Sequence, residues 1–268
     1  MIKNEDYEIY KEELLKKFSN ILQLQKPIYL YKYLPLEGAV SSLEYKNIQF
    51  SSPFTFNDIT EGRNSRFIFM GKELRKVLLS TSLNKYEINK SIDSRNIDNM
   101  TDEKIETIFS NQFEKITFGN TGVACFTTIE NSEFHWQNYA NMHKGICIRY
   151  NFENLLKFWN AQTNLFTYQG IKSLITNYII YLNSINPIIF KDENKFLCAI
   201  NWLNVKHKSY EPESEFRIYS NNCNISKGYD RIRISKNSID KIYIGKNVQS
   251  VDKNKIEKLG FLIHKTDN

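Results

Sequence analysis

The first 26 residues carry their apolar side chains at helical spacing. An apolar residue recurs there every three or four positions, namely Tyr7, Tyr10, Leu14, Leu15, Phe18, Ile21 and Leu22. This spacing predicts an amphipathic helix within residues 1–26, which Pro27 ends. Residues 28–33 then alternate and are rich in β-formers, so we predict a strand, followed by a short helix at 41–45 and a second strand at 47–52.

The pattern changes twice further along the chain. Residues 53–66 look irregular, and the residues between them and Gly122 look polar and helical. From Gly122 onward the predicted order is strand, short helix, strand and long helical region, at residues 123–127, 134–142, 145–150 and 152–202, with an interruption near residues 166–168. The C-terminal part returns to strands, at residues 213–220, 231–235, 239–244 and, after a helix, 261–264.

These elements predict an α+β fold. Helices and strands come in mixed clusters without the regular alternation of a doubly wound sheet, so we expect a mixed, mainly antiparallel sheet flanked by helices. We find no internal repeat and no Pro/Gly/Ser linker. We therefore expect a single domain over residues 1–268, with an N-terminal helix in 1–26, a core in 27–250, and a C-terminal helix and strand in 251–268.

Composition narrows the class of protein. The 268 residues are 41% hydrophobic and 25% charged, which argues against intrinsic disorder. The net charge of +6 comes from dispersed Lys and Arg, so an anionic partner is permitted but not required. No apolar run approaches the ~20 residues that span a bilayer, and the N-terminus lacks the sections of a signal peptide. We expect a cytoplasmic protein without a membrane partner, whose dispersed cysteines are buried small hydrophobes.

The segment around residue 215 combines two carboxylates with a guanidinium. If residues 213–219 form a strand, Glu213, Glu215 and Arg217 project from one face, because side chains alternate along a strand. Such a stripe is either a solvated edge with weak ion pairs or a polar cleft.

A second candidate segment carries aromatic and imidazole side chains. On a helix, Trp136, Tyr139 and His143 share one stripe and could stack on a flat heterocycle. They could equally be core residues and a helix cap. The spacing argues against a metal role for His135 and His143, since no Asp, Glu or Cys stands at ligand distance along the chain, and we expect no metal.

Two further segments carry candidate residues for binding. Asn57, Asp58 and Glu61 lie in a turn, where Asn and Asp commonly bond their own backbone, and Tyr31 and Lys32 lie on the first strand. Both groups are also consistent with purely structural roles. The sequence contains none of the common nucleotide-binding, hydrolase or zinc-protease motifs.

Together these segments resemble the uncharacterised bacterial family known as domain of unknown function 2971. The resemblance rests on the Tyr-Lys-Tyr strand at 31–33, the Ser-Ser-Pro-x-x-Phe-Asn-Asp turn at 51–58, Cys-Phe-Thr at 125–127, the Trp-x-x-Tyr-Ala block at 136–145, and Lys206, Tyr210, Glu213, Glu215 and Arg217. This chain has Ile59 where the family has Pro, and Tyr210 where it has Trp.

The order of elements is also similar, more distantly, to that of ADP-ribosyltransferases. That resemblance implies a split sheet and NAD as substrate. It implies that Tyr31 or Lys32 contacts NAD, that Tyr139 stacks on nicotinamide beside Trp136 and His143, that Arg217 or Lys32 holds the pyrophosphate, and that Glu215 or Glu213 is catalytic. Asn57, Asp58 and Glu61 are further candidates for binding the substrate.

Three functions stay open at this point. The first is an NAD-dependent ADP-ribosyltransferase-like enzyme, a bacterial toxin or phage-defence effector that modifies nucleic acid or protein and is paired with a cognate antitoxin. The second is a metal-independent protein that acts on nucleic acid. The third is a non-enzymatic sensing or interaction module. The exposure of Glu213, Glu215 and Arg217 separates them, because an enzyme needs the stripe open to a pocket and a module allows it to be sealed.

Overall fold

The computed structural model describes residues 4–56, 64–80, 99–118, 120–163, 175–220, 223–261 and 263–265. Its contacts divide the chain into two compact units. Unit 1 comprises residues 1–23, 52–121 and 180–208, and unit 2 comprises residues 24–51, 122–179 and 209–268. The expectation of a single domain stays a prediction, because this division does not measure how the units fold.

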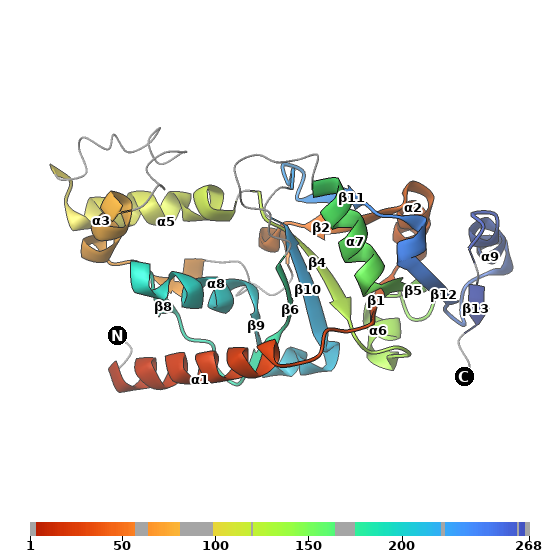
Figure 1. Cartoon of the computed structure of the whole chain (residues 1–268), viewed down its shortest axis with the longest axis horizontal. Coiled ribbons are helices and arrows are strands. Elements are labelled where there is room, and N and C mark those ends of the chain that lie inside the picture. Colours follow the sequence, from red (N-terminus) through yellow and green to blue (C-terminus); the bar gives the residue numbers. More distant parts are fainter. Residues whose placement is uncertain are drawn as a thin grey trace. The chain divides into compact units, whose positions relative to one another are not determined.

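Unit 1 is mainly helical (Figure 1). Its described elements are α1 (Asn4–Leu22), η1 (Pro53–Thr55), η2 (Asn64–Arg66), β3 (Phe67–Ile68), α3 (Gly71–Ser80), α5 (Asp102–Phe118), β7 (Ile180–Leu182), β8 (Ile188–Ile189), η5 (Asp192–Asn194), α8 (Lys195–Leu203) and β9 (Val205–His207). The short strands form two parallel pairs, β3 with β8 and β7 with β9. Helix α1 confirms the amphipathic prediction, since Tyr10, Leu14 and Phe18 enter the core of this unit.

A buried polar network ties the helices of unit 1 together. Tyr10 Oη donates to Asn201 Oδ1 at 2.5 Å, and Arg66 Nη1 donates to the Asn201 carbonyl at 3.0 Å. Asn201 Nδ2 returns a bond to the Arg66 carbonyl at 3.2 Å. Burial raises the pKa of Tyr10 to about 12, so the phenol stays a hydrogen-bond donor. Each buried polar group of this network therefore has a partner.

Unit 2 is built on one sheet, which has nine strands among the residues described. Its elements are β1 (Tyr29–Leu34), α2 (Leu36–Tyr45), β2 (Asn47–Ser51), β4 (Gly122–Thr127), α6 (Glu133–Asn138), β5 (Ile146–Asn151), α7 (Phe152–Thr163), β6 (Ile175–Tyr178), β10 (Glu215–Ser220), β11 (Tyr229–Arg233), η7 (Lys236–Ser238), β12 (Ile239–Ile244), α9 (Ser250–Glu257) and β13 (Ile263–Lys265). The 3₁₀ helix η6 (Lys208–Glu213) precedes β10. The strand order is β11-β2-β4-β1-β5-β12-β13, with β10 on β4 and β6 on β10.

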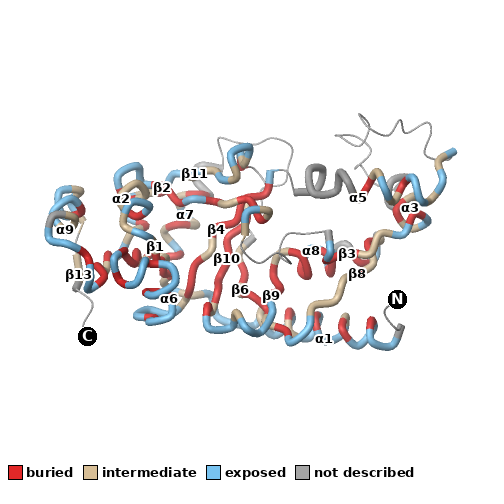
Figure 2. The backbone as a smooth tube through the Cα atoms, turned by 180° about the vertical axis from the view of Figure 1, so that it is seen from behind, coloured by how far each residue is buried: buried red, intermediate tan, exposed pale blue. Residues whose placement is uncertain are grey.

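The pairing is antiparallel except between β12 and β13. The predicted α+β class with a mixed, mainly antiparallel sheet and flanking helices is therefore confirmed. One face of the sheet carries the larger core, to which α2 and α7 contribute Leu43 and Trp159. The other face carries a smaller cluster in which Tyr31 and Tyr33 pack on Trp136. Figure 2 shows the buried residues concentrated along the central strands of this sheet.

The sheet contains a gap along one edge of β4. On that edge β1 pairs with β4 at Tyr31 and Thr127, and β2 pairs with β4 at Ser51 and Val123. On the opposite edge β10 pairs with β4 along its whole length, from Thr127 to Gly122. Strands β1 and β2 therefore share one edge of β4 and leave a gap in the sheet between them, beside Cys125.

The helical prediction for residues 152–202 is wrong in its middle. Helix α7 ends at Thr163, and β6, β7 and β8 follow before α8 begins at Lys195. The segment from residue 175 to 182 is rich in Ile and Tyr, which favour strands, and here tertiary pairing determines its state. The predicted interruption at residues 166–168 lies outside the described residues.

No described helix has both the length and the apolar composition that a bilayer crossing requires.

Candidate functional site

Glu215 and Arg217 lie on the face of the sheet that carries Tyr31. In the β4–β10 register Glu215 lies opposite Thr127 and Arg217 opposite Cys125, so the two side chains project from the same face. Tyr31 also lies opposite Thr127, from β1. The shared face of Glu215 and Arg217 is the one that strand alternation predicts, and the pairing of β1 and β10 with β4 brings Tyr31 to it from a distant part of the sequence.

Glu215 and Arg217 form a buried ion pair along β10. Arg217 Nε donates to Glu215 Oε1 at 2.7 Å, and Arg217 Nη2 donates to Glu215 Oε2 at 2.8 Å. The residues are 5% and 2% exposed. The guanidinium fork therefore engages both carboxylate oxygens in a two-bond geometry that is among the stronger side-chain pairings.

Glu213 is not on the strand, and the prediction that 213–219 is one strand is wrong at its start. Pro212 lies inside η6, which ends at Glu213, and Ser214 adopts a left-handed φ of 40° before β10 begins at Glu215. Glu213 is nevertheless buried close by, and Tyr139 Oη donates to its Oε1 at 2.6 Å. The chain turn at Ser214, not strand alternation, brings Glu213 to this side.

His135 lies between two tyrosine rings. Its ring centroid is 5.1 Å from that of Tyr33 and 5.4 Å from that of Tyr139, and both pairs are stacked. His135 Nδ1 lies 2.7 Å from Ser132 Oγ, which also caps α6. Burial lowers the pKa of His135 to about 4, against opposing contributions from the Glu213 backbone and the Glu215 carboxylate, so the imidazole is neutral near pH 7.

The sequence did not single out His135 as part of this cluster. From the sequence it is a candidate only as a metal ligand, beside His143. The available signal is Ser132, a cap residue three positions before His135 at the start of a predicted helix. Among the described residues, no group of three or more His, Cys, Asp and Glu side chains is arranged to hold a metal ion.

Trp136 and His143 do come together, although the predicted helical stripe is wrong. Helix α6 ends at Asn138, Tyr139 is its C-cap, and residues 141–143 adopt left-handed φ values of 48°, 51° and 62°. This turn brings the His143 ring onto the Trp136 ring, with centroids 5.5 Å apart and planes inclined by 11°. His143 Nε2 also lies 2.9 Å from Glu133 Oε1. Tyr139, on the other side of the turn, stacks on His135 instead.

Tyr31 belongs to a network on β5 and β12. Burial raises the pKa of Tyr31, and the nearby Glu130 carboxylate adds to the shift while Arg149 opposes it. Arg149 Nε donates to Asp240 Oδ2 at 2.6 Å, and Arg149 Nη1 donates to Glu130 Oε1 at 3.2 Å. The buried Tyr31 side chain thus lies among charged partners that fix its position.

Lys32 reaches into the gap between β1 and β2. Its Nζ donates to the Cys125 carbonyl at 2.8 Å and lies 5.1 Å from the centroid of the Phe126 ring. Burial lowers the pKa of Lys32, and nearby Cys125 and Glu215 oppose the shift. Lys32 therefore lies close enough to Glu215 for their charges to interact.

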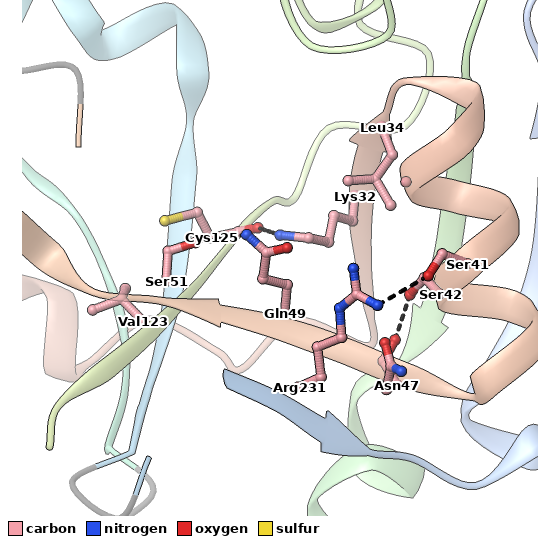
Figure 3. Close-up of a pocket in the computed structure, with 11 residues that line it drawn as sticks. Lys32, Leu34, Ser41, Ser42, Asn47, Gln49, Ser51, Val123, Cys125 and Arg231 are labelled. Carbon is pink, nitrogen blue, oxygen red and sulfur yellow. Dashed lines mark hydrogen bonds between the residues drawn. The ribbon is translucent and has the colours of Figure 1, made fainter. Parts of the chain in front are cut away.

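The gap holds a pocket of about 170 Å³, lined by residues of β1, α2, β2, β4 and β11 (Figure 3). Lys32 and Cys125 contribute to its wall, and Arg231 contributes from β11. Arg231 and the polar residues of β2 that line this pocket were not among the sequence candidates, because their convergence depends on the β2–β11 pairing.

The remaining candidates, Asn57, Asp58 and Glu61, lie outside the described residues.

A family model described as "Protein of unknown function (DUF2971)" matches residues 135–218. The match runs from α6 to β10 and includes Tyr139, Glu213, Glu215 and Arg217, and over these residues it supports the resemblance that the sequence motifs predict. No curated protein and no solved structure matches the chain.

Proposed function

We propose that the chain is a non-enzymatic binding module, in which the polar residues of the family motifs stabilise the sheet and a separate pocket receives the ligand. The observation that supports this proposal is the ion pair of Glu215 with Arg217. Both side chains are buried, and the guanidinium occupies both oxygens of the carboxylate. This is the sealed arrangement expected of a structural pair.

The alternative use of Glu215, as a catalytic carboxylate, conflicts with this pairing. A carboxylate that stabilises an oxocarbenium-like ribose must face the substrate and keep its charge available. If Arg217 turned away from Glu215, the ion pair between these two buried charges would be broken, and breaking such a pair is strongly destabilising. The pairing therefore favours a structural role for Glu215 over a catalytic role.

One contact favours a second candidate function, an NAD-consuming ADP-ribosyltransferase-like enzyme. Tyr139 is 42% exposed, and its hydroxyl donates to Glu213. In this candidate Glu213 is the catalytic carboxylate, Tyr139 stacks on nicotinamide, and Trp136 with His143 supports the turn that presents it. The bond between nicotinamide and ribose C1′ breaks with its electron pair leaving on nicotinamide, and a nucleophile of the acceptor bonds to C1′.

The biological setting goes with this second candidate. An enzyme of this kind would be a cytoplasmic toxin or phage-defence effector that modifies nucleic acid or protein, held inactive by a cognate antitoxin.

The two candidates make opposite predictions for NAD turnover. Adenylate-labelled NAD would be incubated with bacterial lysate and wild-type protein, Glu213→Gln or Glu215→Gln, with label and released nicotinamide both measured. Nicotinamide release needs no acceptor, so it also detects plain hydrolysis. The binding module predicts no label transfer and no release above buffer. Release by the wild type that Glu213→Gln abolishes, with its unfolding unchanged, would establish the enzyme instead.

A further inference from the structure

The pocket in the gap of the sheet has the composition of an anion site. Lys32 projects from β1, Gln49 from β2 and Arg231 from β11, and the three polar groups converge on the same space (Figure 3). Serine side chains of α2 complete one wall. None of the described residues that line the pocket carries a carboxylate, so two cationic groups face it without an acidic side chain in its wall.

Both cations donate to neutral acceptors. Lys32 Nζ donates to the backbone carbonyl of Cys125, and Arg231 Nη1 donates to Ser41 Oγ at 3.1 Å. The Lys32 side chain is partly buried, and a carbonyl, an aromatic ring and the nearby Glu215 carboxylate compensate its desolvation in part. An anion in the pocket would add to that compensation.

The donors suit a phosphate group in number and kind. Arg231 can present its guanidinium fork to two phosphate oxygens, and Lys32 can act as a point charge from the opposite side. The Gln49 amide donates one N–H to Ser51 Oγ at 3.1 Å and keeps a second N–H as a neutral donor, and the Ser41 hydroxyl can still donate its proton while it accepts from Arg231. The volume of about 170 Å³ suits a phosphate group with a small organic substituent.

We propose that this pocket binds a phosphate group, either as inorganic phosphate or as the phosphate of a small monoester. The inference rests on the proposed binding function, for which it supplies the class of ligand. It involves no covalent step. The protein contributes two cations and several neutral donors, and the ligand contributes the negative charge.

Isothermal titration calorimetry of the full chain tests this inference. The probes are inorganic phosphate and glycerol 3-phosphate, and sodium chloride at equal ionic strength is the control. Tighter binding of the monoester would identify an organic phosphate as the ligand, and tighter binding of inorganic phosphate would identify the free ion. Each of these results supports the site.

Two arginines of β11 provide a matched pair of variants. Arg231 lines the pocket, and Arg233 is exposed two residues further along the same strand without lining it. Removing a charge-assisted bond weakens binding by about tenfold or more, so Arg231→Gln should show that loss and Arg233→Gln should not. Both changes are at exposed positions, so folding should survive them.

The site would be refuted if wild-type protein bound neither probe beyond the chloride control, or if both arginine variants lost affinity equally. If the wild type bound neither probe and also showed no NAD turnover, only phosphate as the class of ligand would be rejected. NAD turnover that depends on Glu213 would instead reject the binding module, whatever the titration with phosphate gives.

Discussion

Glu215 and Arg217 show how two residues of one strand can satisfy each other. Their spacing of two positions predicts a shared face, and the structure confirms it. The sequence left open whether the face would be sealed or exposed, because burial depends on elements distant along the chain. In the folded chain both edges of β10 are paired, and the side chains of Glu215 and Arg217 are buried.

His135 was harder to identify from the sequence. Its neighbours Tyr33 and Tyr139 lie on β1 and at the end of α6, and only the folded sheet brings their rings to either side of the imidazole. A lone histidine in a helix is usually a core or cap residue. Its environment, and with it the lowered pKa, follows from packing that spacing along the chain does not encode.

His135 predicts a loss of stability on acidification. Its pKa is about 4 in the folded protein, against 6.5 for the unperturbed group. Between these pH values the unfolded state binds the proton and the folded state does not, so stability falls as pH drops below 6.5. The contribution approaches about 1.4 kcal/mol per pH unit inside this window and vanishes above it.

Urea unfolding at several pH values between 4 and 7.5 measures this effect. Carboxylates also titrate at the acidic end, so His135→Gln is the reference that isolates the imidazole. The difference in slope between wild type and His135→Gln should appear below pH 6.5. Equal slopes for the two proteins would contradict the assignment.

The ends of elements were predicted less well than the elements themselves. The strands around β1, β4, β5 and β12 were placed within a residue or two, because their alternation is plain. Helix α6 was extended too far, since residues 139–143 have no glycine or proline to mark its end. The left-handed turn that ends it is made by Asn141, Met142 and His143, residues that rarely adopt this conformation in succession.

This turn stores backbone strain that a glycine would relieve. Met142 has a φ of 51° and is 70% exposed, so its side chain contributes little burial. A residue with a Cβ costs roughly 1–2 kcal/mol in the left-handed conformation. Glycine avoids this cost but loses more conformational entropy on folding, which offsets part of the gain. We expect Met142→Gly to raise the free energy of unfolding by about 0.5–1 kcal/mol.

The matched control is Met142→Ala, which removes the same thioether and keeps the Cβ. Chemical denaturation of the three proteins should place Met142→Ala at or below the wild type and Met142→Gly above both. A glycine variant no more stable than the alanine variant would show that the turn is unstrained.

At the scale of the whole molecule, the fold class followed from the mixture of elements, and the strand order did not. Strands β1 and β2 share one edge of β4, and each pairs with it near a different end, at Thr127 and at Val123. The resulting pocket combines residues that are far apart in the sequence, such as Lys32 and Arg231. Polar residues such as Gln49 look like ordinary surface positions until β11 pairs with β2.

The parallel strand pairs of unit 1 were also missed. Strands β3 and β8 have two residues each, and β7 and β9 have three, too short for a periodic signal. The β3–β8 pairing joins segments on either side of residues 122–179, which belong to unit 2. Short strands of this kind are stable only through the cores around them, here the cluster that includes Trp202 and Phe190.

The central claim is that Glu215 stabilises the fold through Arg217. The direct test is the free energy of unfolding of full-length Glu215→Gln by chemical denaturation, with exposed Glu211→Gln as the matched control. Removing one partner of a buried ion pair costs about 3–5 kcal/mol, and a surface change stays within about 0.5 kcal/mol. We predict that large loss for Glu215→Gln alone. A Glu215→Gln protein as stable as Glu211→Gln, in which NAD turnover present in the wild type is lost, would contradict the account and make Glu215 a catalytic residue.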